Sequence, residues 1–235
     1  MDVLNKPQHT FINSAQLKII AMISMLIDHT GAFILLPWLR AGNGYADFEN
    51  WDIIYTVLRS VGRLAFPLFC FLIVEGFIHT SDVKKYMTRL GIAALVSEIP
   101  FDLARSGTFF DFSGQNVMFT LLSGLIAIWC IKHIRHPLLR LAGVAMSLVG
   151  VIFLDTDYSY LGVAVIIILY ILRDFRFLQS VFGALSFIGS TFAMPAFIIT
   201  YFYNGDKGRL NSKIFYWFYP VHLLIYALIA HLLLT

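Results

Sequence analysis

Long apolar runs follow one another along almost the whole chain, and each is bounded by charged residues or by Pro and Gly. Such runs predict membrane-spanning helices, which need about 20 apolar residues each when upright. The runs cover residues 17–36, 53–79, 86–104, 116–131, 138–154, 158–172, 177–189, 191–203 and 213–234. The pattern predicts an all-α, polytopic integral membrane helical bundle that forms a single domain over residues 1–235.

Basic residues collect in alternate connections between the runs, which the positive-inside rule assigns to the cytoplasm together with Lys6 and Lys18 near the N terminus. The number of spans depends on residues 177–203. A single crossing there would place the following basic connection, residues 204–213, outside the cell, against the pattern of the other basic connections. We therefore expect two crossings that turn near Gly189, nine transmembrane helices and an external C terminus; one crossing would give eight. The alternating basic residues are Lys84, Lys85 and Arg89; Lys132, Arg135 and Arg140; Arg173 and Arg176; and Lys207, Arg209 and Lys213.

The composition agrees with this assignment. The chain has 235 residues, of which 59% are hydrophobic and 13% charged, far from the composition of a soluble domain. We expect a multi-pass protein of the cell (inner) membrane, with the lipid bilayer as a partner and no nucleic acid. Cys70 and Cys130 both lie in apolar runs and imply no disulfide.

Asp28 and His29 lie inside the first apolar run. An ionised side chain at mid-bilayer costs roughly 2.5 to 3.5 kcal/mol, whereas each Leu, Ile or Phe returns only about 0.3 to 0.6 kcal/mol. Counting 1.5 Å per residue places His29, Arg63, Glu98 and His222 at a shared depth of roughly 14 to 18 Å. A buried reaction centre or an ion relay requires such a shared depth on several helices.

Lys18 precedes His29 by eleven residues on one helix face, about 16 Å nearer the cytoplasm. This geometry suits a ligand with an anionic head group and a long arm that ends at a base, and acyl-CoA has that shape. Alternatively, Lys18 only anchors the helix end by snorkelling, and His29 is a hydrogen-bonded core histidine. Neighbouring helical side chains point about 100° apart, so we expect Asp28 to pair with Arg63 on another helix.

Five sequence blocks resemble the TraX family. The blocks are LKIIAMISMLIDHTG (17–31), GRLAFPLFCFLIVEGF (62–77), RLGIAALVSEIPFDL (89–103), DTDYSYLGV (155–163) and FYPVHLLIY (218–226). The founding members of that family are conjugative-transfer proteins that N-acetylate pilin, and the family is similar to the wider superfamily of transmembrane acyltransferases. Lys18 and His29 match the basic-x10-His motif on the first helix of the type 3 enzymes of that superfamily. The resemblance implies transfer of an acyl group from acyl-CoA to a hydroxyl or an amine.

We therefore expect an acyltransferase that moves an acetyl or related acyl group from cytoplasmic acetyl-CoA, as co-substrate and without a metal, to an acceptor at or across the membrane. The acceptor would be a pilin-like peptide, a glycan or a small molecule. His29 is the expected general base, because an imidazole with its ordinary pKa near 6.5 suits that task. Asp28 or Glu98 would orient His29 or stabilise its charge, and Arg63 would stabilise the oxyanion or hold Asp28. The residues expected to hold CoA phosphates are Lys18, Lys84, Lys85 and Arg89, and the further candidate site residues are Glu75 and His222.

Two other functions use the same residue types. A proton-coupled transporter would employ intramembrane Asp, Glu, His and Arg, and it predicts inverted repeats and broken helices; we detect no repeat. A non-catalytic component of a conjugation or envelope apparatus predicts that the buried charges are replaceable without loss of function.

Overall fold

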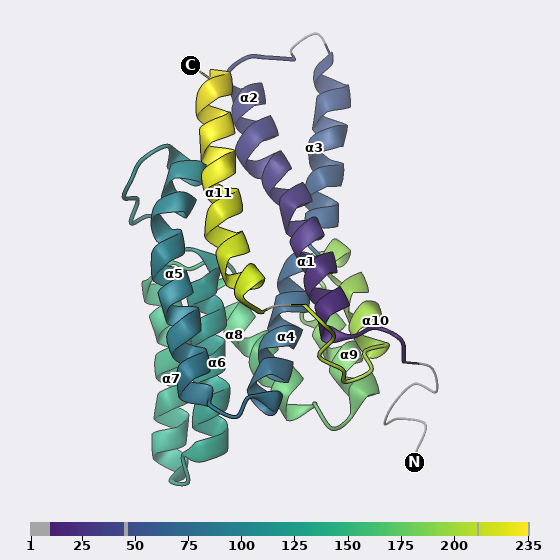
Figure 1. Ribbon diagram of the computed structural model, residues 1–235, viewed down its shortest axis with the longest axis vertical. Coiled ribbons are helices and arrows are strands. Elements are labelled where there is room, and N and C mark those ends of the chain that lie inside the picture. The colour runs from purple at the N-terminus through teal and green to yellow at the C-terminus, as the bar shows by residue number, and fades with distance from the viewer. Residues whose placement is uncertain (1–9, 45–46, 211, 235) are drawn as a thin grey trace.

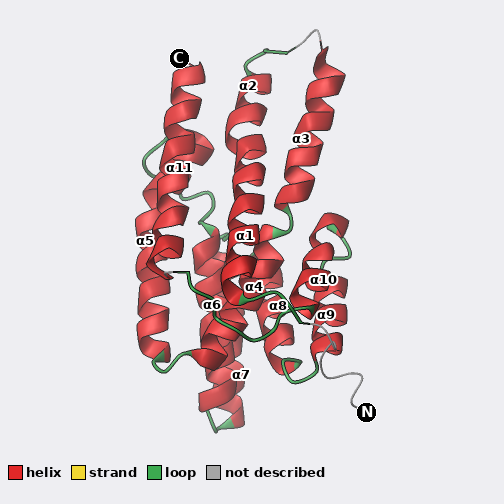
Figure 2. Cartoon of the chain, turned by 45° about the vertical axis from the view of Figure 1, so that its right-hand side comes forward, coloured by secondary structure: helices red, strands yellow, loops and turns green. Residues whose placement is uncertain are grey.

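The computed structural model describes residues 10–44, 47–210 and 212–234, and Figure 2 shows that they form helices joined by loops. Lys6 lies outside the described residues, as does the side chain of Lys213. The helices are α1 (Ser14–His29), a π-helical turn (Thr30–Leu35), α2 (Leu36–Arg40), α3 (Phe48–Gly62), α4 (Ala65–His79), α5 (Val83–Ser106), α6 (Val117–His133), α7 (Pro137–Phe153), α8 (Ser159–Ile171), α9 (Arg176–Leu185), a 3-10 turn (Thr191–Ala193), α10 (Pro195–Tyr201) and α11 (Ser212–Leu234).

Local sequence signals explain where several helices begin and end. Asn13 and Gln16 form a reciprocal capping box at the start of α1. Asp82 caps α5 by accepting from the Lys85 amide at 3.0 Å. Gly107, at φ 72°, ends α5 in the left-handed conformation that glycine adopts without strain.

Among the described residues, three helical segments are long and apolar enough to cross a membrane, namely Ser14–Arg40, Phe48–His79 and Ile214–Leu233. Shorter apolar helices accompany them, among them α6, α7 and α8. The all-helical prediction is confirmed for the described residues, and the apolar helices indicate a membrane protein.

Residues 177–203 form a hairpin, as the sequence predicts. Helices α9 and α10 pack against each other and are joined by a turn that contains Gly189. With 10 and 7 residues, the two arms reach about 15 and 10 Å, well short of the roughly 30 Å of a bilayer's hydrocarbon core. Neither arm alone is therefore long enough to reach across such a core as a regular helix. The number of crossings at 177–203 stays a prediction, and both ends of the hairpin lie on one side.

The basic connections lie at one end of the molecule. Figure 1 shows the start of α5, the α6–α7 connection and the α8–α9 connection in the half of the molecule that holds the start of α1, and the end of α2, the start of α3 and the end of α11 at the opposite end. The segment before α11 also lies near the start of α1, because the Ser14 amide donates to the Asp206 carbonyl at 2.8 Å. The sequence pattern of alternating charge thus corresponds to two chemically distinct ends.

Helix α4 runs through the middle of the bundle and is buried along most of its length. It packs against α1, α8 and α10, while α11 packs along α5. Helices α6 and α8 approach closely at Gly124, where a Cβ would lie only 2.3 Å from the Ile166 Cδ1 atom. Apolar side chains also cover the outer faces, such as Leu95 at 68% exposed. This packing sets the positions of α1, α4 and α11 within the bundle.

Candidate functional site

Asp28 and His29 lie where α1 gives way to the π-helical turn. Such turns are rare and occur frequently at functional sites. The Thr30 hydroxyl donates to the Leu26 carbonyl at 2.9 Å, a back-bond that often bends helices. The helix is therefore irregular at the point where its two half-buried polar residues, Asp28 and His29, lie beside the cavity.

His29 contacts His222 of α11. The His29 Nδ1 atom lies 2.8 Å from the His222 Nε2 atom, and the His222 Nδ1 atom lies 2.7 Å from the Phe218 carbonyl oxygen. A carbonyl only accepts, so His222 Nδ1 carries the proton, and when both rings are neutral its Nε2 accepts from His29 Nδ1–H. These hydrogen bonds assign the tautomers. They leave His29 Nε2 unprotonated, as a general base requires.

Aromatic packing holds both imidazoles. The two rings are nearly parallel, with centroids 5.0 Å apart and an interplanar angle of 9°. Phe33 packs on His29 at 4.8 Å, and Phe218 stacks on His222 at 4.7 Å. His222 is only 4% exposed. The sequence prediction that His29 and His222 share a depth is confirmed by their direct contact.

Asp28 forms its ion pair with Arg59, with 2.5 Å between Oδ2 and Nη1. The predicted Asp28–Arg63 pair is wrong, because Arg59 lies one turn earlier on α3 and reaches the carboxylate, whereas Arg63 follows the end of that helix and faces the Tyr158 hydroxyl. Gly62 permits the approach of α3, since a Cβ there would lie 2.2 Å from the Asp28 Cβ. The Asp28 Oδ1 atom is buried without a hydrogen-bond partner among the described residues.

A cavity of about 230 Å³ opens beside His29. Its wall carries the charged residues Asp28, Arg59, Arg63, Arg105 and Asp157 among aromatic and small apolar side chains. An apolar pocket with a few polar groups is the usual form of a small-molecule site. The aromatic lining consists of Phe33, Phe66, Phe69, Phe101, Tyr158 and Tyr219.

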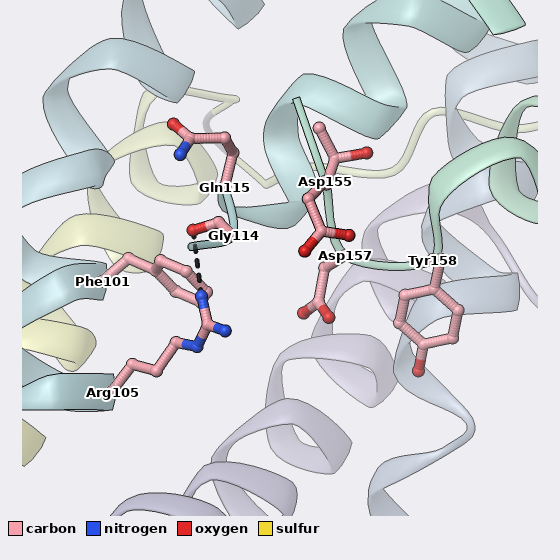
Figure 3. A pocket seen from close by; sticks show the side chains of 8 residues that line it. Phe101, Arg105, Gly114, Gln115, Asp155, Asp157 and Tyr158 are labelled. Atoms are coloured by element: carbon pink, nitrogen blue, oxygen red, sulfur yellow. Dashed lines mark hydrogen bonds between the residues drawn. The ribbon is translucent and has the colours of Figure 1, made fainter. Parts of the chain in front are cut away.

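A second cavity of about 260 Å³ adjoins the first, because Phe101, Arg105, Asp157 and Tyr158 line both. Figure 3 shows Arg105 and the pair Asp155 and Asp157 on opposite walls of this second cavity. The Arg105 guanidinium donates to the Gly114 carbonyl at 3.1 Å (Figure 3). The cavity beside His29 therefore continues toward the loops that follow α5 and α7.

The loop between α7 and α8 presents Asp157 and Tyr158 to both cavities. Asp155, Tyr158 and Ser159 have φ values of 48°, 61° and 39°, a region that non-glycine residues rarely occupy. The Asp157 amide donates to the Gln115 carbonyl at 3.1 Å, which ties the loop to the start of α6. Backbone strain of this kind clusters at functional sites, so the loop conformation supports a site here.

Glu98 does not contact His29. It accepts a hydrogen bond from the Asn116 side chain, the N-cap of α6, and it lines neither cavity. The Asn116 side chain also donates to the Ala94 carbonyl at 2.9 Å. The predicted role of Glu98 or Asp28 in orienting His29 is therefore wrong, because His222 supplies that hydrogen bond.

Glu75 belongs to a separate buried cluster. Its Oε1 atom lies 3.5 Å from the Arg176 Nη2 atom, and Arg176 Nη1 donates to the Gln179 Oε1 atom at 2.8 Å. Phe71 lies beneath the guanidinium, with 5.0 Å from its carbon to the ring centroid. Because these side chains join α4 to α9, Glu75 has a structural environment distinct from that of His29.

The predicted phosphate-binding residues lie on α1 and on the first two turns of α5. The Lys18 Nζ atom is 4.8 Å from the Phe215 ring centroid. Lys84 and Lys85 are exposed on the first turn of α5, and the Arg89 Nε atom donates to the Lys85 carbonyl at 3.2 Å. The structure thus places these basic side chains on two helices, outside the walls of the cavity beside His29.

The sequence reasoning missed several residues of the cavity walls, chiefly Arg59, Arg105, Asp157 and Tyr158. The cost of a charge within an apolar run would have found Arg59, which lies in the run at 53–79. Asp157 and Tyr158 gave no such signal, because Asp157 lies in a connection where polar residues are ordinary and Tyr158 begins the next apolar run without a charge. Both lie in the block 155–163 that resembles the TraX family.

The chain is similar to known proteins over most of its length. The family described as TraX protein matches residues 13–230. A relative from Dichelobacter nodosus, named "Probable fimbrial assembly protein FimC, serogroup H1", is 32% identical over 242 residues, which cover 88% of this chain and 91% of the relative. No solved structure matches the chain.

Proposed function

The chain belongs to the TraX family, and we propose that it is a membrane acyltransferase that moves an acetyl or related acyl group from acyl-CoA to a hydroxyl or an amine of an acceptor. The observation that carries this proposal is the chain of hydrogen bonds from the Phe218 carbonyl through His222 to His29. It provides an oriented imidazole with one free basic nitrogen beside a cavity.

In the proposed reaction, His29 Nε2 takes the proton of the acceptor hydroxyl or amine as its oxygen or nitrogen attacks the thioester carbonyl. The new C–O or C–N bond forms, the C–S bond then breaks, and the CoA thiolate recovers the proton from the imidazolium. His222 stabilises the imidazolium through the 2.8 Å hydrogen bond from His29 Nδ1. Arg63 would stabilise the oxyanion, since Asp28 already neutralises Arg59.

We place the CoA phosphates at Lys18, with support from Lys84, Lys85 and Arg89. These residues lie at the end that the positive-inside rule assigns to the cytoplasm, where acyl-CoA is available. Lysine side chains bind phosphates as flexible point charges, and an arginine such as Arg89 binds them through its planar fork of donors. The acyl group would reach His29 from this end along α1.

Lys18→Ala should weaken acetyl-CoA binding, and the loss should shrink as salt rises because an accessible charge is screened. Isothermal titration calorimetry of the purified protein at several salt concentrations measures the affinity for acetyl-CoA. Lys132→Ala is the matched control, because Lys132 also sits over a phenylalanine ring, 5.0 Å from the Phe77 centroid, but outside the proposed site. Equal affinities for Lys18→Ala and the wild type would remove Lys18 from the donor site.

We propose seven crossings and a hairpin that enters and leaves on one side. The crossings are α1 with α2, α3 with α4, α5, α6, α7, α8 and α11. This number keeps the N terminus in the cytoplasm and the C terminus outside, in the cell membrane, as the basic connections require.

A second proposal is a role in assembling a pilus or conjugation apparatus, which the name of the Dichelobacter nodosus relative favours. The two roles are compatible if the acceptor is a subunit of that apparatus. A purely non-catalytic role predicts that His29→Gln leaves assembly intact, whereas the acyltransferase role predicts loss of the modification.

A further inference from the structure

Tyr226 lies on α11 four residues after His222, so the two side chains share one face of the helix. Its hydroxyl donates to the Leu26 carbonyl at 2.8 Å and lies 2.9 Å from the Thr30 hydroxyl. Leu26 and Thr30 flank the segment that carries His29 on α1. Helix α11 therefore contacts α1 at His29 itself and on both sides of it.

The Leu26 carbonyl is the centre of this arrangement. It accepts from the Thr30 amide, the Thr30 hydroxyl and the Tyr226 hydroxyl. The regular α-helical hydrogen-bonding pattern ends here, because the π-helical turn begins at Thr30. A π turn inserts an extra residue and so changes the direction of the side chains around it. The Tyr226 hydroxyl contacts Leu26, before the π-helical turn, and Thr30, at its start.

We propose that Tyr226 is a positioning residue that fixes the π-helical turn and thereby holds His29 at hydrogen-bond distance from His222. This inference rests on the proposed role of His29 as general base. A helix with its side chains is about 10 to 12 Å wide, so a rotation of roughly 10° moves a side-chain end by about 1 Å. A shift of that size would take the 2.8 Å contact between the imidazoles out of hydrogen-bond range.

The ring of Tyr226 also packs against the site, and its role must be separated from that of the hydroxyl. The ring meets both imidazoles edge-on, with centroids 6.3 Å from His29 and 6.0 Å from His222. Tyr226→Phe keeps this packing and removes only the hydroxyl. The variant therefore tests the hydroxyl's contact with Leu26 and Thr30 rather than the packing of the ring against the imidazoles.

Tyr226→Phe should lower kcat for acyl transfer by about 10- to 100-fold, the scale expected for a misplacement of about 1 Å, and leave the KM for acetyl-CoA unchanged. Thr30→Ser, which keeps a hydroxyl at the contact, should retain more activity than Thr30→Val. The control is Tyr201→Phe on α10, whose ring packs on Phe177 and Phe202 away from these contacts; it should behave as the wild type. Because Tyr226 acts through the histidine pair, Tyr226→Phe should add no further loss in a His222→Gln background.

A second measurement does not depend on acyl transfer. Nitrogen-15 NMR of ring-labelled histidine reports which nitrogen carries the proton, and His29→Gln and His222→Gln assign the signals. Wild-type protein should show both rings protonated at Nδ1, and Tyr226→Phe should turn the His29 signals into those of a tautomer mixture. Unchanged ring signals in Tyr226→Phe would overturn the inference. If the ring signals change in Tyr226→Phe but the wild-type protein has no transferase activity, the positioning role is supported and the proposed function is rejected.

Discussion

Replacing His29 with glutamine should lower acyl transfer by about 10²-fold or more, the usual contribution of a general base, and leave acetyl-CoA binding intact. Glutamine keeps the polarity and can still hydrogen-bond His222, but it cannot take a proton at neutral pH. Single-turnover transfer from labelled acetyl-CoA, measured beside equilibrium binding of acetyl-CoA, separates the two effects.

His136→Gln is the matched control, because His136 is exposed in the α6–α7 connection, outside the cavities. It should retain wild-type transfer. If His29→Gln also retains near-normal turnover, His29 is a structural hydrogen-bonding residue and the proposed mechanism is incorrect. If binding and transfer fall together while the protein stays folded, His29 belongs to the donor pocket instead.

The second large effect is on stability. Glu75→Ala removes the partner of Arg176, and both side chains are less than 10% exposed. An uncompensated buried charge should lower the free energy of unfolding by about 3 to 5 kcal/mol, measured by denaturant titration in detergent micelles.

The chain contains a matched control at the neighbouring connection. Arg173 and Asp174 also form a pair at 3.5 Å, but the Asp174 side chain is 71% exposed. Removing it with Asp174→Ala should cost about 1 kcal/mol or less, because water screens an exposed pair. If Glu75→Ala costs no more than Asp174→Ala, the buried pair does not hold α4 to α9.

The sequence is sufficient to locate the site, because polar residues are expensive in an apolar run. That cost singles out Asp28 and His29, and counting depth along the helices brings His222 to the same level. Counting depth along the helices does not identify which side chain each polar residue contacts. Arg59 and Arg63 lie four residues apart, about 6 Å along a helix, and only the close approach of α3 at Gly62 decides that Arg59 meets Asp28.

The hydrogen-bond partner of His29 is beyond sequence reasoning for a similar reason. His222 lies 193 residues away in the chain, and the contact depends on how α11 crosses α1 at the π-helical turn. Nothing in the hydrophobic pattern indicates a π turn, because it changes the direction of side chains without changing their polarity. The hairpin at 177–203 is predictable from charge alternation, but the shortness of its arms is not.

The most direct test of the central claim is transfer of label by the purified protein. Wild-type protein in lipid vesicles, incubated with [¹⁴C]acetyl-CoA and a membrane and envelope extract, should move the label from CoA to an extract component. The His29→Gln protein, prepared in the same way, should bind acetyl-CoA and transfer the label about 10²-fold more slowly or less. Wild-type protein that neither binds acetyl-CoA nor labels any component beyond the level of empty vesicles would contradict the assignment of this chain as an acyltransferase.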